Sequence, residues 1–164
     1  CSSDLGRALI RRRTLDGWTN FVYIPDVDHM ITKSGRMLGW QVYVQRANYR
    51  FSLIIFRRIS GYRYKIVSIK TITPRRRGLV TIPVNARVKA GDFLGFHYPR
   101  KSTIPFTYRR CGKAKKGALY VRNPQRVTRG AVFAFSPLKT CRDYSFAVAV
   151  SVSKYNIFCF TLRF

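Results

Sequence analysis

Arginine and lysine gather in short clusters along this chain, and such clusters are suited to binding anions. The chain has 32 Lys and Arg residues against six Asp and no Glu, which gives a net charge of +26 in 164 residues. Repulsion within a cluster is poorly screened at physiological salt, so a cluster costs stability unless an anion lies against it. The candidate polyanion-binding residues are Arg11, Arg12, Arg13, Arg57, Arg58, Arg75, Arg76, Arg77, Arg100, Lys101, Arg109, Arg110, Lys113, Lys115 and Lys116.

The choice between the two basic residue types indicates the kind of anion. Arginine outnumbers lysine 22 to 10. The planar guanidinium group binds sulfate, phosphate or carboxylate through two parallel hydrogen bonds, whereas lysine would serve solubility equally well. The bias therefore predicts a partner that carries such groups.

Four cysteines, Cys1, Cys111, Cys141 and Cys159, are the disulfide candidates. Their spacings of 110, 30 and 18 residues match no zinc site. Two disulfides in an oxidising compartment fit better, and three connectivities are open. We prefer Cys111 with Cys141 and Cys1 with Cys159, which would tie the N-terminus to the last strand.

Asp26 and Asp28 are weak candidates for a calcium site, because calcium prefers carboxylate and carbonyl oxygens. The alternative is a turn in which these carboxylates cap backbone amides or pair with arginine. We expect no other metal and no cofactor.

Catalysis is not expected from the remaining residues. His29 beside Asp26 and Asp28 is the only acid–imidazole cluster that is close in sequence. His97 and Asp92 are an odd number of residues apart, so on one strand their side chains would point to opposite faces. No Gly-x-Ser-x-Gly, His-Glu-x-x-His or Walker pattern occurs. The sequence predicts a binding or structural protein rather than an enzyme.

Strands must position these groups, because apolar residues recur at every second position in much of the chain. Trp40, Val42 and Val44 give the clearest alternation. Residues 51–56 are apolar on both faces, which places them at the centre of a sheet. Further strands are predicted at residues 18–24, 62–72, 79–84 with an interruption at Pro83, 93–98, 119–121, 131–135, 144–152 and 157–164.

Turn residues separate the predicted strands. A hairpin turn is expected at 60–61 and a loop at 73–78, which Pro and Gly bracket. Gly91 can adopt a positive φ, and Asp92 can bind nearby backbone amides at the entry to the next strand. Gly95 within that strand indicates the close approach of a large side chain or of another backbone.

The chain is predicted to be one all-β domain over residues 1–164, an antiparallel β-sandwich of jelly-roll type with nine to eleven strands and at most one short helix. Residues 1–17 form a basic lead-in, for which a flexible arm, a packed edge strand and a short helical turn near Leu5 stay open. If successive strands pair as hairpins, their loops alternate between the two ends of the sandwich. One end then holds Arg46, Arg50, Arg75, Arg76, Arg77, Arg100 and Lys101, and the other holds Arg57, Arg58, Arg87 and Lys89.

Residues 35–106 resemble a domain of large extracellular animal proteins. The similar stretches are Met-Leu-Gly-Trp-Gln-Val-Tyr at 37–43, Leu-Ile-Ile-Phe-Arg at 53–57, Tyr-Lys-Ile-Val at 64–67, Gly-Asp-x-Leu-Gly-Phe at 91–96 and Ile-Pro-Phe at 104–106. The Val-x-x-Gly-Asp entry at 88–92 is also similar to that of C1q- and TNF-like jelly rolls. The resemblance implies a secreted β-sandwich without catalytic residues.

The expected function is the binding of extracellular polyanions, namely sulfated glycans or acidic glycoprotein coats and matrix, by the basic loops. The chain begins at Cys1 without Met, which we interpret as a mature secreted form, with a trimmed sequence as the alternative. Two other functions stay open: packaging of nucleic acid by a basic coat protein, and attack on anionic membranes. The small residues on one face of strand 144–152 also leave association with a second copy open.

Overall fold

The computed structural model describes residues 3–6, 9–25, 29–109, 117–138, 140–144 and 146–151; for 3–6, 109 and 147–151 it describes the backbone alone. All paired strands are antiparallel, and no α-helix occurs among these residues. The strands are β1 (Ser3–Gly6), β2 (Phe21–Ile24), β3 (Gly35–Val44), β4 (Phe51–Ser60), β5 (Arg63–Ile72), β6 (Gly78–Val88), β7 (Phe93–Tyr98), β8 (Phe106–Arg109), β9 (Leu119–Arg122), β10 (Val132–Ala134), β11 (Ser136–Pro137), β12 (Cys141–Tyr144) and β13 (Phe146–Ser151). The predicted all-β fold is confirmed.

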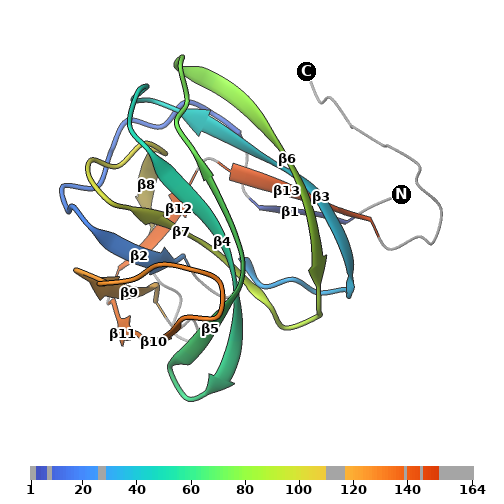
Figure 1. The fold of residues 1–164 in the computed structure, drawn as a ribbon. Helices are drawn as coiled ribbons and strands as arrows, with labels where there is room; N and C mark the ends of the chain where they lie inside the picture. The colour runs from blue at the N-terminus through green and yellow to red at the C-terminus, as the bar shows by residue number, and fades with distance from the viewer. Residues whose placement is uncertain are drawn as a thin grey trace.

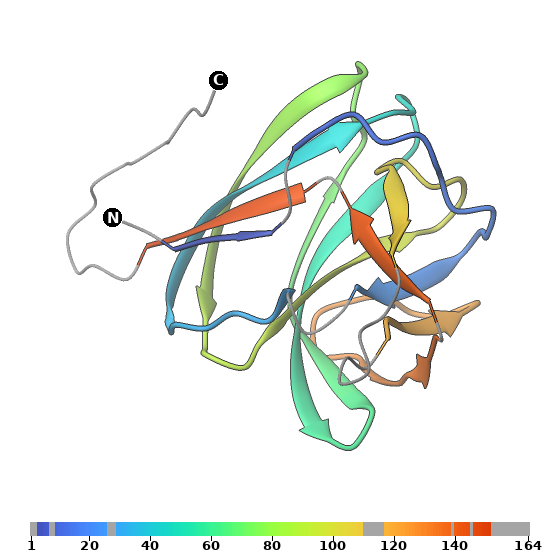
Figure 2. The same ribbon diagram turned by 180° about the vertical axis from the view of Figure 1, so that it is seen from behind.

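Two large sheets pack face to face as a sandwich (Figures 1 and 2). One sheet has four strands in the order β1-β13-β3-β6, and the other has seven in the order β10-β5-β4-β7-β2-β9-β11. A third, two-stranded ladder joins β8 to β12. The two large sheets together hold eleven strands, in agreement with the predicted nine to eleven. The chain crosses between the layers from β3 to β4 and from β5 to β6, as in a jelly roll.

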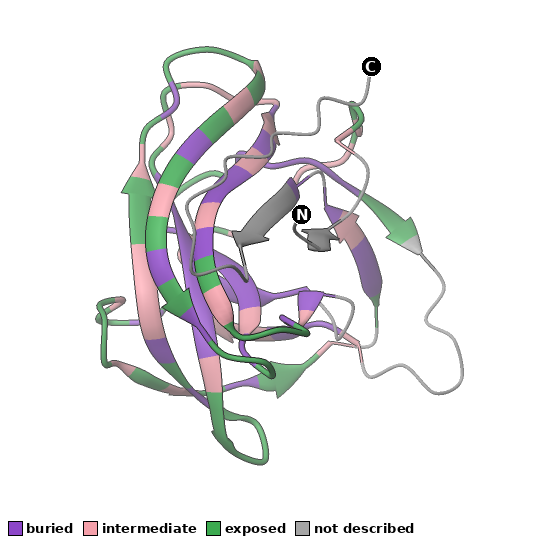
Figure 3. Ribbon diagram, turned by 90° about the vertical axis from the view of Figure 1, so that its right-hand side faces the viewer, coloured by how far each residue is buried: buried purple, intermediate pink, exposed green. Residues whose placement is uncertain are grey.

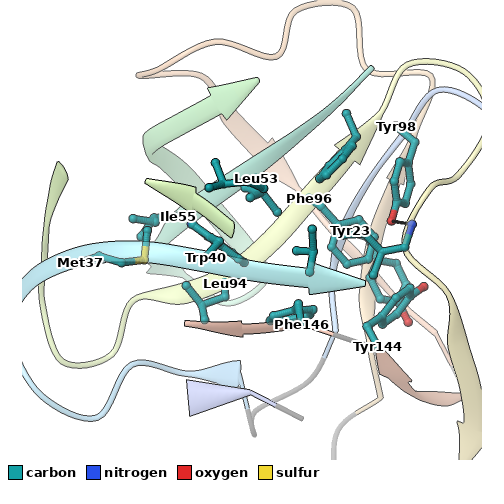
Figure 4. Close-up of a cluster of buried hydrophobic side chains, with 14 of the residues drawn as sticks. Tyr23, Met37, Trp40, Leu53, Ile55, Leu94, Phe96, Tyr98, Tyr144 and Phe146 are labelled. Atoms are coloured by element: carbon teal, nitrogen blue, oxygen red, sulfur yellow. Dashed lines mark hydrogen bonds between the residues drawn. The ribbon is translucent and has the colours of Figure 1, made fainter. Parts of the chain in front are cut away.

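The main hydrophobic core fills the space between the two sheets (Figure 4). Trp40 of β3 and Phe146 of β13 pack with ring centroids 5.6 Å apart, and Phe96 of β7 faces them from the other sheet. The buried Tyr98 hydroxyl accepts a hydrogen bond from the backbone N–H of Ile104 at 3.2 Å. This bond satisfies a polar atom that would otherwise be costly to bury.

A second core lies on the other face of the seven-stranded sheet. Along β4, Leu53 and Ile55 face the main core, whereas Ile54 and Phe56 face the second one. Strands β10 and β11 occupy the two edges of this sheet, yet only Phe135 separates them in the chain. The sheet therefore curls back toward itself, and Phe135 is buried in the core that it encloses.

Several local predictions are confirmed. Residues 51–56 are all buried in β4, which lies between β5 and β7. Gly61 and Gly91 have φ of 49° and 88° in the two predicted turns, which are values that glycine adopts readily. The Asp92 carboxylate accepts a hydrogen bond from the backbone N–H of Lys89 at 2.9 Å, as expected for the entry to β7.

Two predictions about local structure are wrong in part, and one open alternative is decided. Strand β6 continues through Pro83, although its pairing with β3 is irregular between Pro83 and Ala86. The strand can contain this proline because β6 is an edge strand, where a residue without an N–H can be accommodated. The predicted strand 144–152 is two strands: β12 ends at Tyr144 and pairs with β8, while β13 begins at Phe146 and pairs with β3. In the lead-in, residues 3–6 form the edge strand β1, which is one of the alternatives left open by the sequence.

Gly95 is the position where the second core is least tolerant of an added atom. A Cβ there would collide with the backbone carbonyl of Tyr23 and would lie 2.8 Å from Cε2 of the Phe56 ring. The expected close approach is thus confirmed. We expect Gly95→Ala to lower the free energy of unfolding by about 1–3 kcal/mol or more, because an overpacked core forces backbone shifts.

Urea denaturation measures this loss, with Gly17→Ala as the matched control. A Cβ at Gly17 meets nothing within 4 Å, so the control should unfold like the unmodified protein. Equal stability of the two variants would contradict the close packing at Gly95.

Candidate polyanion-binding rim

Three basic loops meet at one end of the sandwich. The backbone N–H of Asn48 donates to the carbonyl of Pro74 at 2.8 Å, which joins the loop after β3 to the loop after β5; both lie at the top of Figure 1. The N–H of Gln45 donates to the carbonyl of Thr103 at 3.0 Å and adds the loop after β7. These bonds confirm that the three loops share one end. We call their basic side chains the basic rim: Arg46, Arg50, Arg75, Arg76, Arg77, Arg100 and Lys101.

Two of these cations contact the ring of Tyr49. The guanidinium carbon of Arg46 and the ammonium nitrogen of Lys101 each lie 5.8 Å from the centroid of the Tyr49 ring. Such cation–π contacts contribute about 0.5–1 kcal/mol each at exposed sites. No acidic residue occurs in the three loops, so the Tyr49 ring, rather than a carboxylate, positions these two cations.

The lead-in runs beside the basic rim. Thr14 and Phe106 exchange two backbone hydrogen bonds, at 3.3 and 2.8 Å. The side-chain amide of Gln45 donates to the carbonyl of Arg13 at 3.4 Å, and Arg12 donates to the Thr107 hydroxyl at 3.1 Å. The predicted cluster at 11–13 therefore adjoins the rim, although it is far from the rim loops in sequence.

A buried ion pair ties the lead-in to β12. The Arg142 guanidinium binds the Asp16 carboxylate, and the Tyr144 hydroxyl donates to the same carboxylate at 2.8 Å. The Ser102 hydroxyl donates to the backbone carbonyl of Asp16 at 2.8 Å, which connects the pair to the loop that carries Lys101. Burial raises the pKa of Asp16, and the attraction of Arg142 and the hydrogen bonds to the carboxylate offset part of this rise.

Aromatic rings surround Arg142. Its guanidinium carbon lies 4.5 Å from the ring centroid of Phe106, 5.5 Å from Tyr23, 5.6 Å from Tyr108 and 5.9 Å from Trp18. These ring faces replace part of the hydration that the buried cation has lost. Arg142 is therefore a structural cation, enclosed by the protein itself.

At the opposite end of the sandwich, Arg57, which was predicted to bind a ligand, instead forms an ion pair within the protein. Nε and Nη2 of Arg57 each donate to one carboxylate oxygen of Asp92 at 2.8 Å. This hydrogen bonding raises the pKa of Arg57. Asp92 also accepts a hydrogen bond from Lys89 in the turn before β7, so Arg57 and Lys89 lie at the same end of the sandwich, as predicted. Arg58, Arg87 and Lys89 are exposed.

A row of polar side chains crosses the seven-stranded sheet at the level where the rim loops begin. Ser52 of β4 lies opposite Thr71 of β5 on one side and opposite His97 of β7 on the other. The hydroxyl oxygens of Ser52 and Thr71 are 2.8 Å apart. His97 Nε2 lies 3.2 Å from Oδ1 of Asn20, just before β2. Burial and the nearby charge of Arg50 lower the pKa of His97 to about 4, so its imidazole is neutral at physiological pH. The row offers neutral hydrogen-bonding groups beside a cation of the rim.

Other predicted site residues lie outside the described ranges: Cys1, Asp26, Asp28, Arg110, Cys111, Lys113, Lys115, Lys116, Cys159 and the strand 157–164. Of Arg109 the backbone alone is described, in β8 opposite Cys141. In the part of the chain that the structure describes, no three His, Cys, Asp or Glu side chains form a group suited to a metal ion. Within the same part, no helix has the length and apolarity to cross a membrane.

The sequence analysis missed the Asp16–Arg142 pair and the polar row. Asp16 and Arg142 are 126 residues apart, and neither belongs to a recognisable motif. One available signal was the apolar residue next to each one, Leu15 before Asp16 and Cys141 before Arg142, because a charged residue that is buried with its neighbours needs a partner. The row has no comparable signal, because its members are single polar residues at strand ends.

Comparisons with protein-family models, with curated proteins and with solved structures give no significant match. The function is therefore argued from the site alone.

The buried ion pair should be strongly coupled. Asp16→Asn leaves the Arg142 cation buried without its counter-charge, so we expect the free energy of unfolding to fall by about 3–5 kcal/mol. Arg142→Met should cost a similar amount, because it leaves the carboxylate buried. The double variant should lose clearly less than the sum of the two, as measured in a double-mutant cycle by urea denaturation. Additive losses would show that the two groups do not interact.

His97 should make stability depend on pH. The folded protein resists protonation of His97 until about pH 4, whereas the unfolded chain takes up this proton near pH 6.5, so acid favours unfolding. We expect the free energy of unfolding to fall as the pH is lowered from 6.5 to 4. His97→Gln should show a shallower fall over this window. An NMR titration of the imidazole gives the direct check, and a midpoint near 6.5 would contradict the burial of this ring.

Proposed function

We propose that this protein is a secreted, non-enzymatic binder of extracellular polyanions, with sulfated glycans and acidic glycoproteins as its ligand classes. The observation that carries the proposal is the convergence of three loops, distant in sequence and hydrogen-bonded to one another, on one end of the sandwich. They bring seven Arg and Lys side chains together and contain no acid. The lead-in adds its own arginines beside them.

In the proposed mode of binding, guanidinium groups of the rim contact sulfate or carboxylate groups through paired hydrogen bonds. The two cations that contact Tyr49, Arg46 and Lys101, bind anionic groups of the ligand. The exposed Thr71 and the half-buried His97 of the neutral row form hydrogen bonds with uncharged sugar hydroxyls beside the rim. This mixture of charged and neutral groups supports a glycan more than a nucleic acid, whose backbone is charged at every phosphate.

An extracellular location with disulfides belongs to the same proposal. Cys141 is fully buried, and we assign it to a disulfide. Its cross-strand partner Arg109 precedes Cys111 by two residues, which supports the pairing of Cys111 with Cys141.

Removal of rim charge tests the proposal. The variant Arg75→Gln/Arg76→Gln/Arg77→Gln should elute from a heparin column at distinctly lower salt than the unmodified protein. The slope of log affinity against log salt should become shallower by about 2 to 3, since each lost anion contact removes close to one released counterion. Retention on duplex DNA should change much less.

The matched control removes three cations from the other end: Arg63→Gln/Lys65→Gln/Arg87→Gln. It has the same net charge, so any difference from the rim variant reports position and not total charge. Equal shifts for the two variants on heparin and on DNA would mean that binding is bulk electrostatics, and the rim proposal would be wrong.

A further inference from the structure

The β4–β5 hairpin projects from the end opposite the basic rim and carries an apolar tip. It forms the lowest point of the molecule in Figures 1, 2 and 3, and its turn is exposed. Ile59 is 53% exposed and Tyr62 is 41% exposed. Val132 of β10, which pairs with β5 opposite Lys65, is 43% exposed. Half of the six large exposed apolar side chains in the described residues thus belong to this hairpin and its neighbouring strand.

Cations bracket the apolar tip. The sequence through the turn is Arg-Ile-Ser-Gly-Tyr-Arg, from Arg58 to Arg63, and Lys65 follows on β5. All three cations are exposed, and the Nε of Arg58 donates to the carbonyl of Gly61 at 2.8 Å, which holds its stem along the turn. Neither the hairpin, residues 51–72, nor the segment 117–138 that pairs with it contains an acid.

Two features distinguish the tip from a solvated turn. A turn that only met water would gain nothing from exposed isoleucine, and a ligand that only needed charge would gain nothing from it either. The hairpin is also held rigidly, since β5 is hydrogen-bonded to β4 along its length and to β10 near the tip. An apolar end that is pre-formed, projecting and ringed by cations suits a surface that is anionic outside and apolar just beneath.

We propose that this hairpin docks the protein on anionic lipid bilayers, with Ile59 and Tyr62 entering the interfacial layer and the flanking cations on the headgroups. Arginine and lysine stems can lie along the apolar side chains while their charged ends stay at the phosphates. Tyrosine suits the interface because its ring is apolar and its hydroxyl is wet. The cations Arg58, Arg63 and Lys65 attract the protein to the anionic leaflet. The apolar tip then keeps the protein bound, because its side chains are buried in the interfacial layer. This inference uses the end opposite the rim and stands independently of the proposed polyanion site.

The test uses substitutions that leave the charge of +26 unchanged. Ile59→Ser/Tyr62→Ser should weaken binding to phosphatidylcholine vesicles that contain phosphatidylserine by about tenfold or more, measured by co-sedimentation, because burial of such side chains is lost. Leu79→Ser is the matched control: Leu79 is 47% exposed on β6, away from the hairpin, and its loss should change binding by less than about twofold. Retention of all three proteins on heparin should be the same, which confirms folding and separates this result from the rim.

Insertion has its own readout. Tyr62→Trp should show a blue-shifted emission that brominated acyl chains quench when anionic vesicles are added, beyond the signal of the unmodified protein with Trp18 and Trp40. Pure phosphatidylcholine vesicles should give a much smaller effect, because the cations then have no anionic surface. Unchanged affinity of the Ile59→Ser/Tyr62→Ser variant, or an added emission of the Tyr62→Trp variant that lipid does not alter, would overturn the proposal and leave adsorption by total charge.

Discussion

Two buried carboxylates hold this fold together against its own charge. Asp16 neutralises Arg142 inside an aromatic enclosure, and Asp92 neutralises Arg57 at the entry to β7. Each carboxylate is also bound by a further donor, the Tyr144 hydroxyl in the first case and the Lys89 backbone N–H in the second. With only six acids against 32 basic residues, carboxylates can compensate few cations, and the others must face solvent or a ligand. The small number of carboxylates therefore limits how many cations can be buried and leaves the remaining cations at the surface.

The segment between β7 and β13 explains how a sheet with two apolar faces can stay buried. It adds β9 and β11 beyond one edge of the strands β2-β7-β4-β5 and adds β10 beyond the other. Phe133 and Phe135 from this segment pack on the second core, which includes Phe56 and Tyr64. The same segment, through β12, carries the arginine of the buried ion pair. This one segment therefore closes the outer core and anchors the lead-in.

The sequence was informative where a local rule decides the structure. Apolar residues on both faces of 51–56 can only be satisfied by cover on both sides, and Gly95 can only be required where another atom occupies the place of its side chain. The pairing of Asp16 with Arg142 follows no such rule, because nothing local relates residues 126 positions apart. The change of sheet between Tyr144 and Phe146 is invisible to a period of two, since both residues keep facing the same core. The two-ended placement of the basic loops could be predicted because it depends only on the alternating direction of successive strands. It does not require hairpin pairing, which among β3 to β7 joins only β4 and β5 as consecutive strands. The rim's internal arrangement around Tyr49 depends on side chains from separate loops and could not.

The edge strand β6 of the four-stranded sheet affects how neighbouring molecules could associate. Strand β6 has eleven residues and is hydrogen-bonded to β3 on one side, while its other side is an edge of that sheet. A long edge of this kind invites another chain to continue the ladder. Pro83 divides it into two short stretches, 78–82 and 84–88, because proline offers no N–H to a newcomer. Arg87 adds a cation to one of these stretches, opposite Arg36 on β3. If many of these molecules bound side by side on a polyanion, many such edges would come close together. Pro83 would then prevent continuous strand pairing from one molecule to the next.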